Sequence, residues 1–182
     1  MFYCLLAPGF EEIEAIATVD MLRRGGVEVQ TVGIGCGCTP KIEGGHNITV
    51  TADIKESGIV TDGLEGIILP GGMPGTLNLE KSKTVKKLID YCVFNNLYIC
   101  AICAAPQILG HMGLLSGKRA TCYPGFEDEL IGAQIVNAPA VVDGKIITGK
   151  GPGCTVEFAS AIIEAVADKE TAQKIKDSMQ CQ

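Results

Sequence analysis

Short apolar runs alternate along the chain with longer stretches in which apolar residues recur every three or four positions. Fully apolar runs bounded by glycine or proline are typical of buried strands, whereas strict polar–apolar alternation is typical of a half-buried strand. The alternating segment 48–52 predicts a strand at a sheet edge or in a flap. Further strands are predicted at 2–7, 27–34, 66–69, 97–102, 119–122, 134–137 and 145–148.

Helical spacing between these runs places apolar residues on one face. In the segment 12–24, for example, Ile13, Ile16 and Met21 follow this spacing, and two glycines end the segment. Alternating strands and helices with buried, unalternated strands predict an α/β protein with a mostly parallel sheet and helices on both faces. We expect one domain spanning 1–182. Helices are predicted at 12–24, 82–95, 105–112, 156–167 and 169–179.

The composition of the chain excludes several classes of protein. The chain is 47% hydrophobic and 20% charged, which excludes a disordered polypeptide. Its net charge is −6 and it has no run of more than two basic residues, so we expect no nucleic-acid partner. The longest apolar stretch, 97–106, is about half of what a bilayer requires, so we expect no membrane partner. Nine cysteines without a secretory signal predict reduced thiols and a cytoplasmic location.

The turn after the strand at 97–102 carries the most informative cysteine. Cys103 stands between that strand and a predicted helix, with Ala101 and Ala105 two positions to either side. This is the spacing of a nucleophile elbow, in which small residues allow a sharp turn. A following helix N-terminus would favour the thiolate. Alternatively, Cys103 is one more buried structural thiol.

The remaining cysteines point to no metal site. Cys100 forms a C-x-x-C pair with Cys103 but lies within the strand, so core packing accounts for it. Cys36 and Cys38 lie in a glycine-rich turn and could form half of a metal site. No second pair follows at zinc-site spacing, and the chain has two histidines, so we expect neither metal nor cofactor.

Neither histidine is placed by the sequence beside Cys103. His111 lies eight residues further on, about 12 Å along the predicted helix, and so points at something else. His46 lies in a glycine-rich loop and could reach the site only through folding or from another subunit. A cysteine–histidine dyad therefore has no evident imidazole.

A carboxylate is the remaining candidate for proton transfer. Glu11, Glu12 and Glu14 join the first strand to the first helix. Glu11 and Glu12 suit a first helical turn, where acids complement the helix dipole. Glu14 lies at the boundary of the inward face, where burial would raise its pKa and keep it protonated near neutral pH.

A third strand ends at Pro70, and Gly71 and Gly72 follow it. Glycines in this place can expose amide N–H groups to a developing oxyanion, or can simply form a tight turn.

These turns together resemble the ThiJ/PfpI superfamily, and most closely its DJ-one branch. The resemblance extends almost from end to end and implies a flavodoxin-like three-layer sandwich that is usually a homodimer. It rests on PGFEEIEA (8–15), VDMLRRGGVEV (19–29), LPGGMPGTLNL (69–79), AICAAP (101–106) and GKGPGCTVEFA (149–159).

The resemblance also implies roles for single residues. It makes Cys103 the reactive, readily oxidised cysteine and Glu14 the acid that hydrogen-bonds it. The implied backbone donors are Gly71, Gly72 and Ala104, and the implied pocket-lining residues are Tyr123 and Pro152.

Two departures from the family pattern matter. The proteases of the family carry a histidine directly after the cysteine, whereas this chain has Ala104, which argues against peptidase activity. Some relatives carry a histidine where this chain has Tyr123. Tyrosine is a poor base at neutral pH, because its pKa is near 10.

Residues and resemblance together predict a cofactor-independent glyoxalase or deglycase. It would act on reactive 2-oxoaldehydes such as methylglyoxal and glyoxal, or on a glycated substrate, with Cys103 as nucleophile and Glu14 as general acid and base. The alternative is a non-catalytic oxidative-stress sensor or chaperone whose cysteine is oxidised to sulfenic or sulfinic acid.

Overall fold

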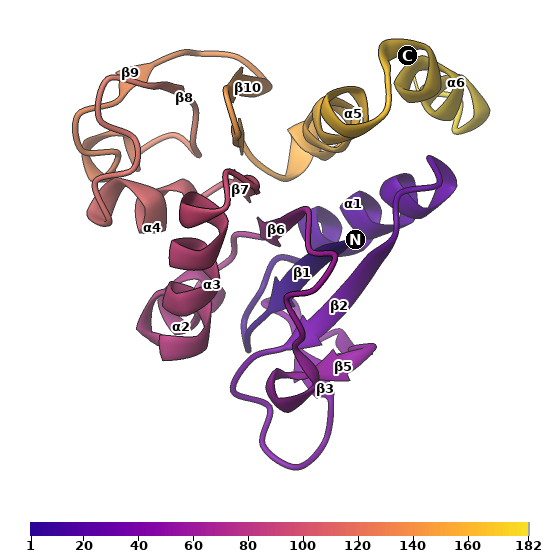
Figure 1. The fold of residues 1–182 in the computed structure, drawn as a ribbon, viewed down its shortest axis with the longest axis vertical. Coiled ribbons are helices and arrows are strands. Elements are labelled where there is room, and N and C mark those ends of the chain that lie inside the picture. The colour runs from indigo at the N-terminus through magenta and orange to yellow at the C-terminus, as the bar shows by residue number, and fades with distance from the viewer. Residues whose placement is uncertain (182) are drawn as a thin grey trace.

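The computed structural model describes residues 1–181, which are built around a seven-stranded sheet (Figure 1). Each neighbouring pair of strands is parallel, except that β10 and β11 are antiparallel. The predicted, mostly parallel α/β architecture is therefore confirmed. In spatial order the strands are β10 (Ala140–Asp143), β11 (Ile146–Gly149), β7 (Tyr98–Ile102), β6 (Gly66–Leu69), β1 (Phe2–Leu6), β2 (Val29–Gly33) and β5 (Ile54–Lys55).

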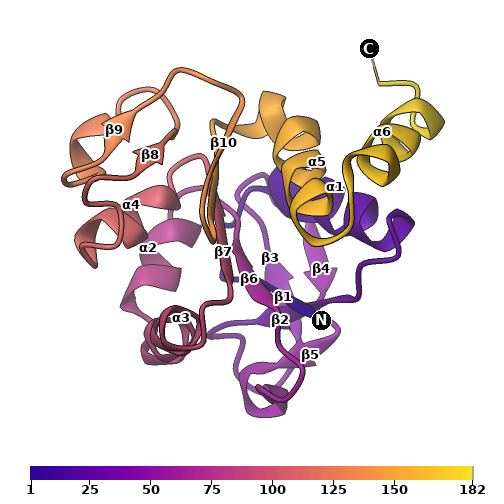
Figure 2. The same ribbon diagram turned by 45° about the horizontal axis from the view of Figure 1, so that its top comes forward.

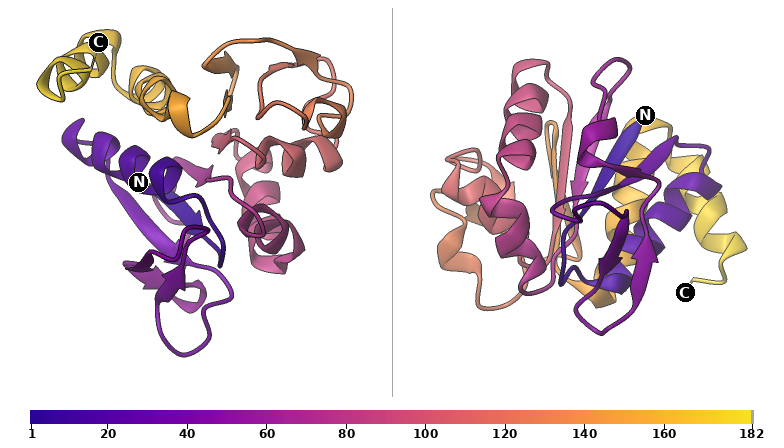
Figure 3. Two further views of the ribbon diagram at one scale, coloured as in Figure 1. Left: turned by 180° about the vertical axis from the view of Figure 1, so that it is seen from behind. Right: turned by 90° about the horizontal axis from the view of Figure 1, so that it is seen from below.

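Helices cover both faces of the sheet and complete the predicted three layers (Figures 2 and 3). Successive side chains of a strand point to opposite faces, so Phe2 and Cys4 pack in the core beneath α1 and α5, whereas Tyr3 and Leu5 pack beneath α2, α3 and α4. Burial on both faces explains why these strands are apolar without alternation. One layer holds α1 (Glu12–Arg24), α5 (Thr155–Val166) and α6 (Lys169–Ser178), and the other holds α2 (Gly75–Lys81), α3 (Lys83–Phe94) and α4 (Pro106–His111).

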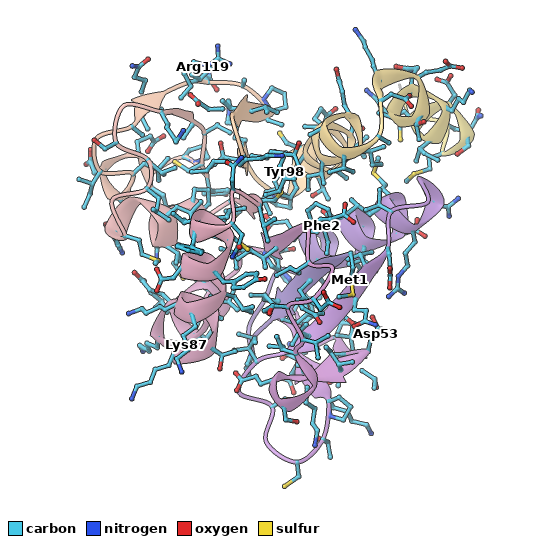
Figure 4. The ribbon with its side chains drawn as sticks, in the orientation of Figure 1. Met1, Phe2, Asp53, Lys87, Tyr98 and Arg119 are labelled. Carbon is cyan, nitrogen blue, oxygen red and sulfur yellow. The ribbon has the colours of Figure 1, made fainter. Side chains whose placement is uncertain are left out.

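Aromatic contacts fix α5 against the sheet. The rings of Phe2 and Tyr98 stack with centroids 6.2 Å apart, and both residues are labelled in Figure 4. The Tyr98 hydroxyl donates a hydrogen bond to the Ala165 carbonyl at 2.8 Å. The Lys145 ammonium lies 3.7 Å from the Tyr98 ring centre, a cation–π contact.

The smaller elements differ most from the predictions. The strands predicted at 119–122 and 134–137 are β8 (Arg119–Ala120) and β9 (Gln134–Ile135), which pair with each other apart from the main sheet. The segment 48–52 contributes β4 (Thr49–Thr51) to a hairpin with β3 (Lys41–Glu43), in the manner of a flap. Strand partners depend on tertiary packing, which a local pattern does not contain. The structure also adds α2, β5, β10 and three short 3-10 helices, η1 (Glu56–Gly58), η2 (Glu127–Glu129) and η3 (Pro152–Cys154).

In the part of the chain that the structure describes, no helix is both long and apolar enough to cross a bilayer. The strands β1, β6 and β7 are parallel neighbours, so the loops after their C-terminal ends meet at one edge of the sheet. Sites of parallel α/β proteins lie at such an edge.

Candidate active site

Cys103 occupies a sharp turn directly after β7. Its φ of +65° lies in the left-handed region, which costs a non-glycine residue about 1–2 kcal/mol. Two hydrogen bonds hold this conformation: the Cys103 N–H donates to the Gly149 carbonyl, and the Tyr123 N–H donates to the Cys103 carbonyl, each at 2.9 Å. The sharp strand-to-helix turn expected of a nucleophile elbow is present.

Glu14 approaches this cysteine from the first turn of α1. The carboxyl group is fully buried, and its Oε2 accepts a hydrogen bond from the Gly71 N–H at 2.8 Å. Burial raises the pKa of Glu14 to about 7, although hydrogen bonds with the Cys103 thiol and the Gly71 amide act in the opposite direction. The raised pKa expected from the sequence is therefore found.

Gly71 stands between these two side chains. A Cβ at this position would lie 2.6 Å from Cys103 Cβ and 2.8 Å from Glu14 Oε2, so a side chain does not fit. The structure corrects the role expected of Gly71, because its N–H is occupied by the Glu14 carboxyl group and is not free for a substrate oxyanion. The amides of Gly72 and Ala104 hydrogen-bond the Cys103 sulfur instead.

The thiol of Cys103 resists ionisation more than the sequence suggested. Burial raises its pKa most, and the neighbouring Glu14 raises it further, whereas the amides of Ala104 and Gly72 lower it. The helix that was expected to stabilise the thiolate, α4, begins only at Pro106. Because each group hinders ionisation of the other, the pair titrates as one unit, and the thiolate forms when Glu14 keeps its proton.

A cavity of about 630 Å³ opens onto the cysteine. Cys103 is only 9% exposed and lines this cavity, which is the route from solvent to sulfur. Tyr123 and Pro152 lie in the lining, where the resemblance implied them. The lining comprises Glu11, Glu12, Ile13, His46, Ile48, Gly72, Met73, Cys103, Ala104, Tyr123, Phe126 and Pro152.

Sequence reasoning missed the contact between Glu12 and His46 at this cavity. The Glu12 Oε1 accepts the His46 backbone N–H at 2.7 Å, and its Oε2 lies 2.9 Å from His46 Nδ1. Glu12 therefore does more than complement the helix dipole, and folding within one chain brings His46 to the site. No spacing signal links positions that are 34 residues apart.

The other candidates lie elsewhere. Cys100 is fully buried in the core, as expected. Cys36 and Cys38, in the loop after β2, do not line the cavity of Cys103. His111 contacts Glu80 and Glu129, as its distance along the helix indicated.

Among residues 1–181, one group of three has ligand atoms close enough to share a metal ion. Its members are Glu11, Glu12 and His46, whose ligand atoms lie within 4.8 Å of one another. Carboxylates beside an imidazole also occur as ordinary ion pairs, and nothing else in this group requires a metal.

Comparisons with known proteins agree with these observations. The model of the DJ-1/PfpI family matches residues 2–165. Protein DJ-1 homolog B of Arabidopsis thaliana is 37% identical over 93% of this chain, which spans only 39% of that protein's length. Glutathione-independent glyoxalase DJR-1.2 of Caenorhabditis elegans is 30% identical over 91% of this chain and 87% of that protein. The crystal structure of Drosophila melanogaster DJ-1beta matches with a TM-score of 0.93 at 33% identity, covering 100% of this chain and 97% of that one.

Proposed function

Because the chain belongs to the DJ-1/PfpI family, as its motifs predicted, we propose that it is a cofactor-independent glyoxalase acting on reactive 2-oxoaldehydes. The observation that carries this proposal is the buried pair of Cys103 and Glu14 at the base of an open cavity. A related protein of Caenorhabditis elegans is named a glutathione-independent glyoxalase. Glycated groups that release such aldehydes are substrates of the same chemistry.

In the first step the sulfur of Cys103 adds to the aldehyde carbon of methylglyoxal. The carbon–sulfur bond forms while the carbonyl oxygen takes the proton of the Glu14 carboxyl group, which gives a hemithioacetal and leaves Glu14 as a carboxylate. The Gly72 and Ala104 amides, which hydrogen-bond the sulfur, would stabilise charge that develops beside it. A single donor of this kind changes a rate by about a hundred- to a thousandfold.

In the second step Glu14 moves a proton. Its carboxylate takes the proton from the carbon bonded to sulfur and returns it to the neighbouring carbonyl carbon. The hydroxyl proton passes to the neighbouring carbonyl oxygen at the same time. The hydroxyl carbon thereby becomes the carbonyl of a thioester, the former carbonyl becomes a hydroxyl group, and no external oxidant is consumed. A carboxyl group with a pKa of about 7 suits this exchange, because both of its protonation states are populated near neutral pH. Water then cleaves the thioester to lactate and restores the thiol.

Lactate formation from methylglyoxal tests this mechanism. We expect turnover to be lost in Cys103→Ser and to fall by about a hundredfold or more in Glu14→Gln. Cys38→Ser is the matched control, because Cys38 is exposed and lies outside the cavity. Wild-type turnover in either site variant would overturn the mechanism.

The same site supports a second candidate function, that of an oxidative-stress sensor or chaperone. Peroxide would transfer an oxygen atom to the Cys103 sulfur and leave as water, giving a sulfenic and then a sulfinic acid. The Ala104 and Gly72 amides that face the sulfur, together with a neutral Glu14, could donate hydrogen bonds to the new oxygens.

Mass spectrometry under dilute peroxide distinguishes the sensor from the glyoxalase. Oxygen addition at buried Cys103 before exposed Cys38, without aldehyde turnover, would favour the sensor. Oxidation in the order of exposure would contradict it.

A second copy of the chain is the proposed partner. Three isoleucines stand exposed near the cavity, Ile13 at 57%, Ile16 at 44% and Ile48 at 56%. Apolar surface of this kind is typical of an interface. Sedimentation of wild type and Ile16→Glu tests the proposal, since Ile16 does not line the cavity. A monomeric wild type would exclude the homodimer.

The cytoplasmic location stays a prediction from cysteine usage.

A further inference from the structure

His46 is held firmly at the open side of the cavity. The turn between β3 and β4 is pinned to the start of α1, because the Gly45 N–H donates to the Phe10 carbonyl at 2.7 Å and the His46 N–H donates to Glu12 Oε1 at 2.7 Å. Gly44 packs directly on the Glu12 carboxyl group, where a Cβ would collide. The position of the imidazole is therefore defined by the fold, although its side chain is 68% exposed.

The contacts of this ring define its chemistry. Nδ1 lies 2.9 Å from Glu12 Oε2, and Glu11 Oε2 lies 3.6 Å from the same nitrogen. A carboxylate can only accept a hydrogen bond, so Nδ1 carries the proton and Nε2 of the neutral ring keeps a lone pair. A carboxylate that orients an imidazole in this way makes it an effective general base.

The two proton-transfer groups differ in their exposure to solvent. Glu14 is fully buried and contacts Cys103 from inside the protein, whereas His46 lies at the solvent side of the cavity. Water reaches a thioester on Cys103 from the solvent side. His46 provides the one imidazole among the residues that line the cavity.

We propose that His46, oriented by Glu12, is the general base that activates water for hydrolysis of the Cys103 thioester, which rests on the proposed glyoxalase function. The water oxygen bonds to the thioester carbon while one water proton passes to Nε2. The carbon–sulfur bond then breaks, and the sulfur leaves with its electron pair. The imidazolium returns its proton to the sulfur, and the new carboxylic acid loses its proton to solvent.

Rapid quenching followed by mass spectrometry separates the two halves of the reaction with methylglyoxal as the probe. In His46→Gln we expect thioester formation at the wild-type rate and hydrolysis about a hundredfold slower, so that acylated Cys103 accumulates. The neutral ring is the active form, so hydrolysis by the wild type rises with pH as His46 loses its proton. His46→Gln lacks this rise.

A second variant tests the role of the carboxylate. Glu12 is the main group that raises the pKa of His46, and Glu11 adds to it. Glu12→Gln keeps a hydrogen-bond acceptor but removes the charge, so the rise in hydrolysis moves to lower pH. In His46→Ala, imidazole added to the medium should restore hydrolysis, which a structural role would not produce. His111→Gln, at the other histidine, is the control and keeps wild-type hydrolysis, because His111 does not line the cavity.

The outcomes separate the two proposals. A wild type that forms neither thioester nor lactate refutes the glyoxalase function itself. A wild type that forms both, beside a His46→Gln variant that hydrolyses its thioester at the same rate, overturns the role of His46 alone. Equal slowing of thioester formation and hydrolysis in His46→Gln, together with no rescue of His46→Ala by imidazole, assigns His46 a structural role and also overturns the proposal.

Discussion

The proton held by Glu14 is open to a direct thermodynamic test. Its pKa of about 7, against an ordinary value of 4.5, corresponds to about 3 kcal/mol of interaction energy. Because the folded-state pKa is raised, this contribution to stability is fully present below pH 4.5 and is lost as the pH rises through about 7. Glu14→Gln is a neutral substitute of nearly the same shape, and it removes this pH dependence.

Urea unfolding at a series of pH values measures the effect. Between pH 4.5 and about pH 8, we expect the free energy of unfolding of the wild type to fall by about 3 kcal/mol relative to Glu14→Gln. Glu164→Gln, the same substitution on the exposed side of α5, controls for the change in net charge. Parallel curves for wild type and Glu14→Gln would show that folding does not raise the pKa of Glu14, so that the group is ionised near neutral pH. The proton transfer assigned to it would then lose its basis.

Three further predictions concern the turn at the cysteine and the region beside it. Gly71→Ala should destabilise the fold by about 1–3 kcal/mol and abolish turnover, as measured by urea unfolding and lactate formation, because its Cβ would overlap the Cys103 side chain. Cys103→Gly should have a free energy of unfolding about 1 kcal/mol higher than that of Cys103→Ala in urea unfolding, since glycine tolerates the positive φ. The side chains of Glu80 and Glu129 raise the pKa of His111, so the bridge between them is present at low pH and weakens as the pH rises through that pKa. The protection of the amides at 123–130, relative to their intrinsic exchange rate at each pH, should fall over that range in wild type and show no such step in His111→Gln.

Local sequence patterns predict most of the helices and strands. The apolar run at 2–7 and the spacing at 12–24 are both found as expected, in β1 and α1. A strand that is buried on both faces is an unbroken apolar run, whereas a helix that is buried on one face leaves a helical period in the sequence. The strands at 119–122 and 134–137 were also recognised, but not that they pair with each other. Pairing depends on which surfaces are left to cover after the main sheet has formed, and no single segment records that.

The features of the site also fall into those that the sequence predicts and those that it does not. Small residues around Cys103 predicted the turn, and the position of Glu14 at the edge of an apolar face predicted its burial and its raised pKa. The sequence predicts a thiolate favoured by a helix N-terminus, whereas burial of Cys103 raises its pKa. The start of a helix can be predicted from sequence, but the depth of burial cannot.

The sequence by itself determined the period of each main element and the residue types at the strand ends. Only the tertiary structure decided that the Gly71 amide is occupied by Glu14, and that His46 meets Glu12 across 34 residues. The physical reason is that hydrogen bonds and desolvation depend on distances between atoms, and distances between remote segments are set by the packing of the whole chain.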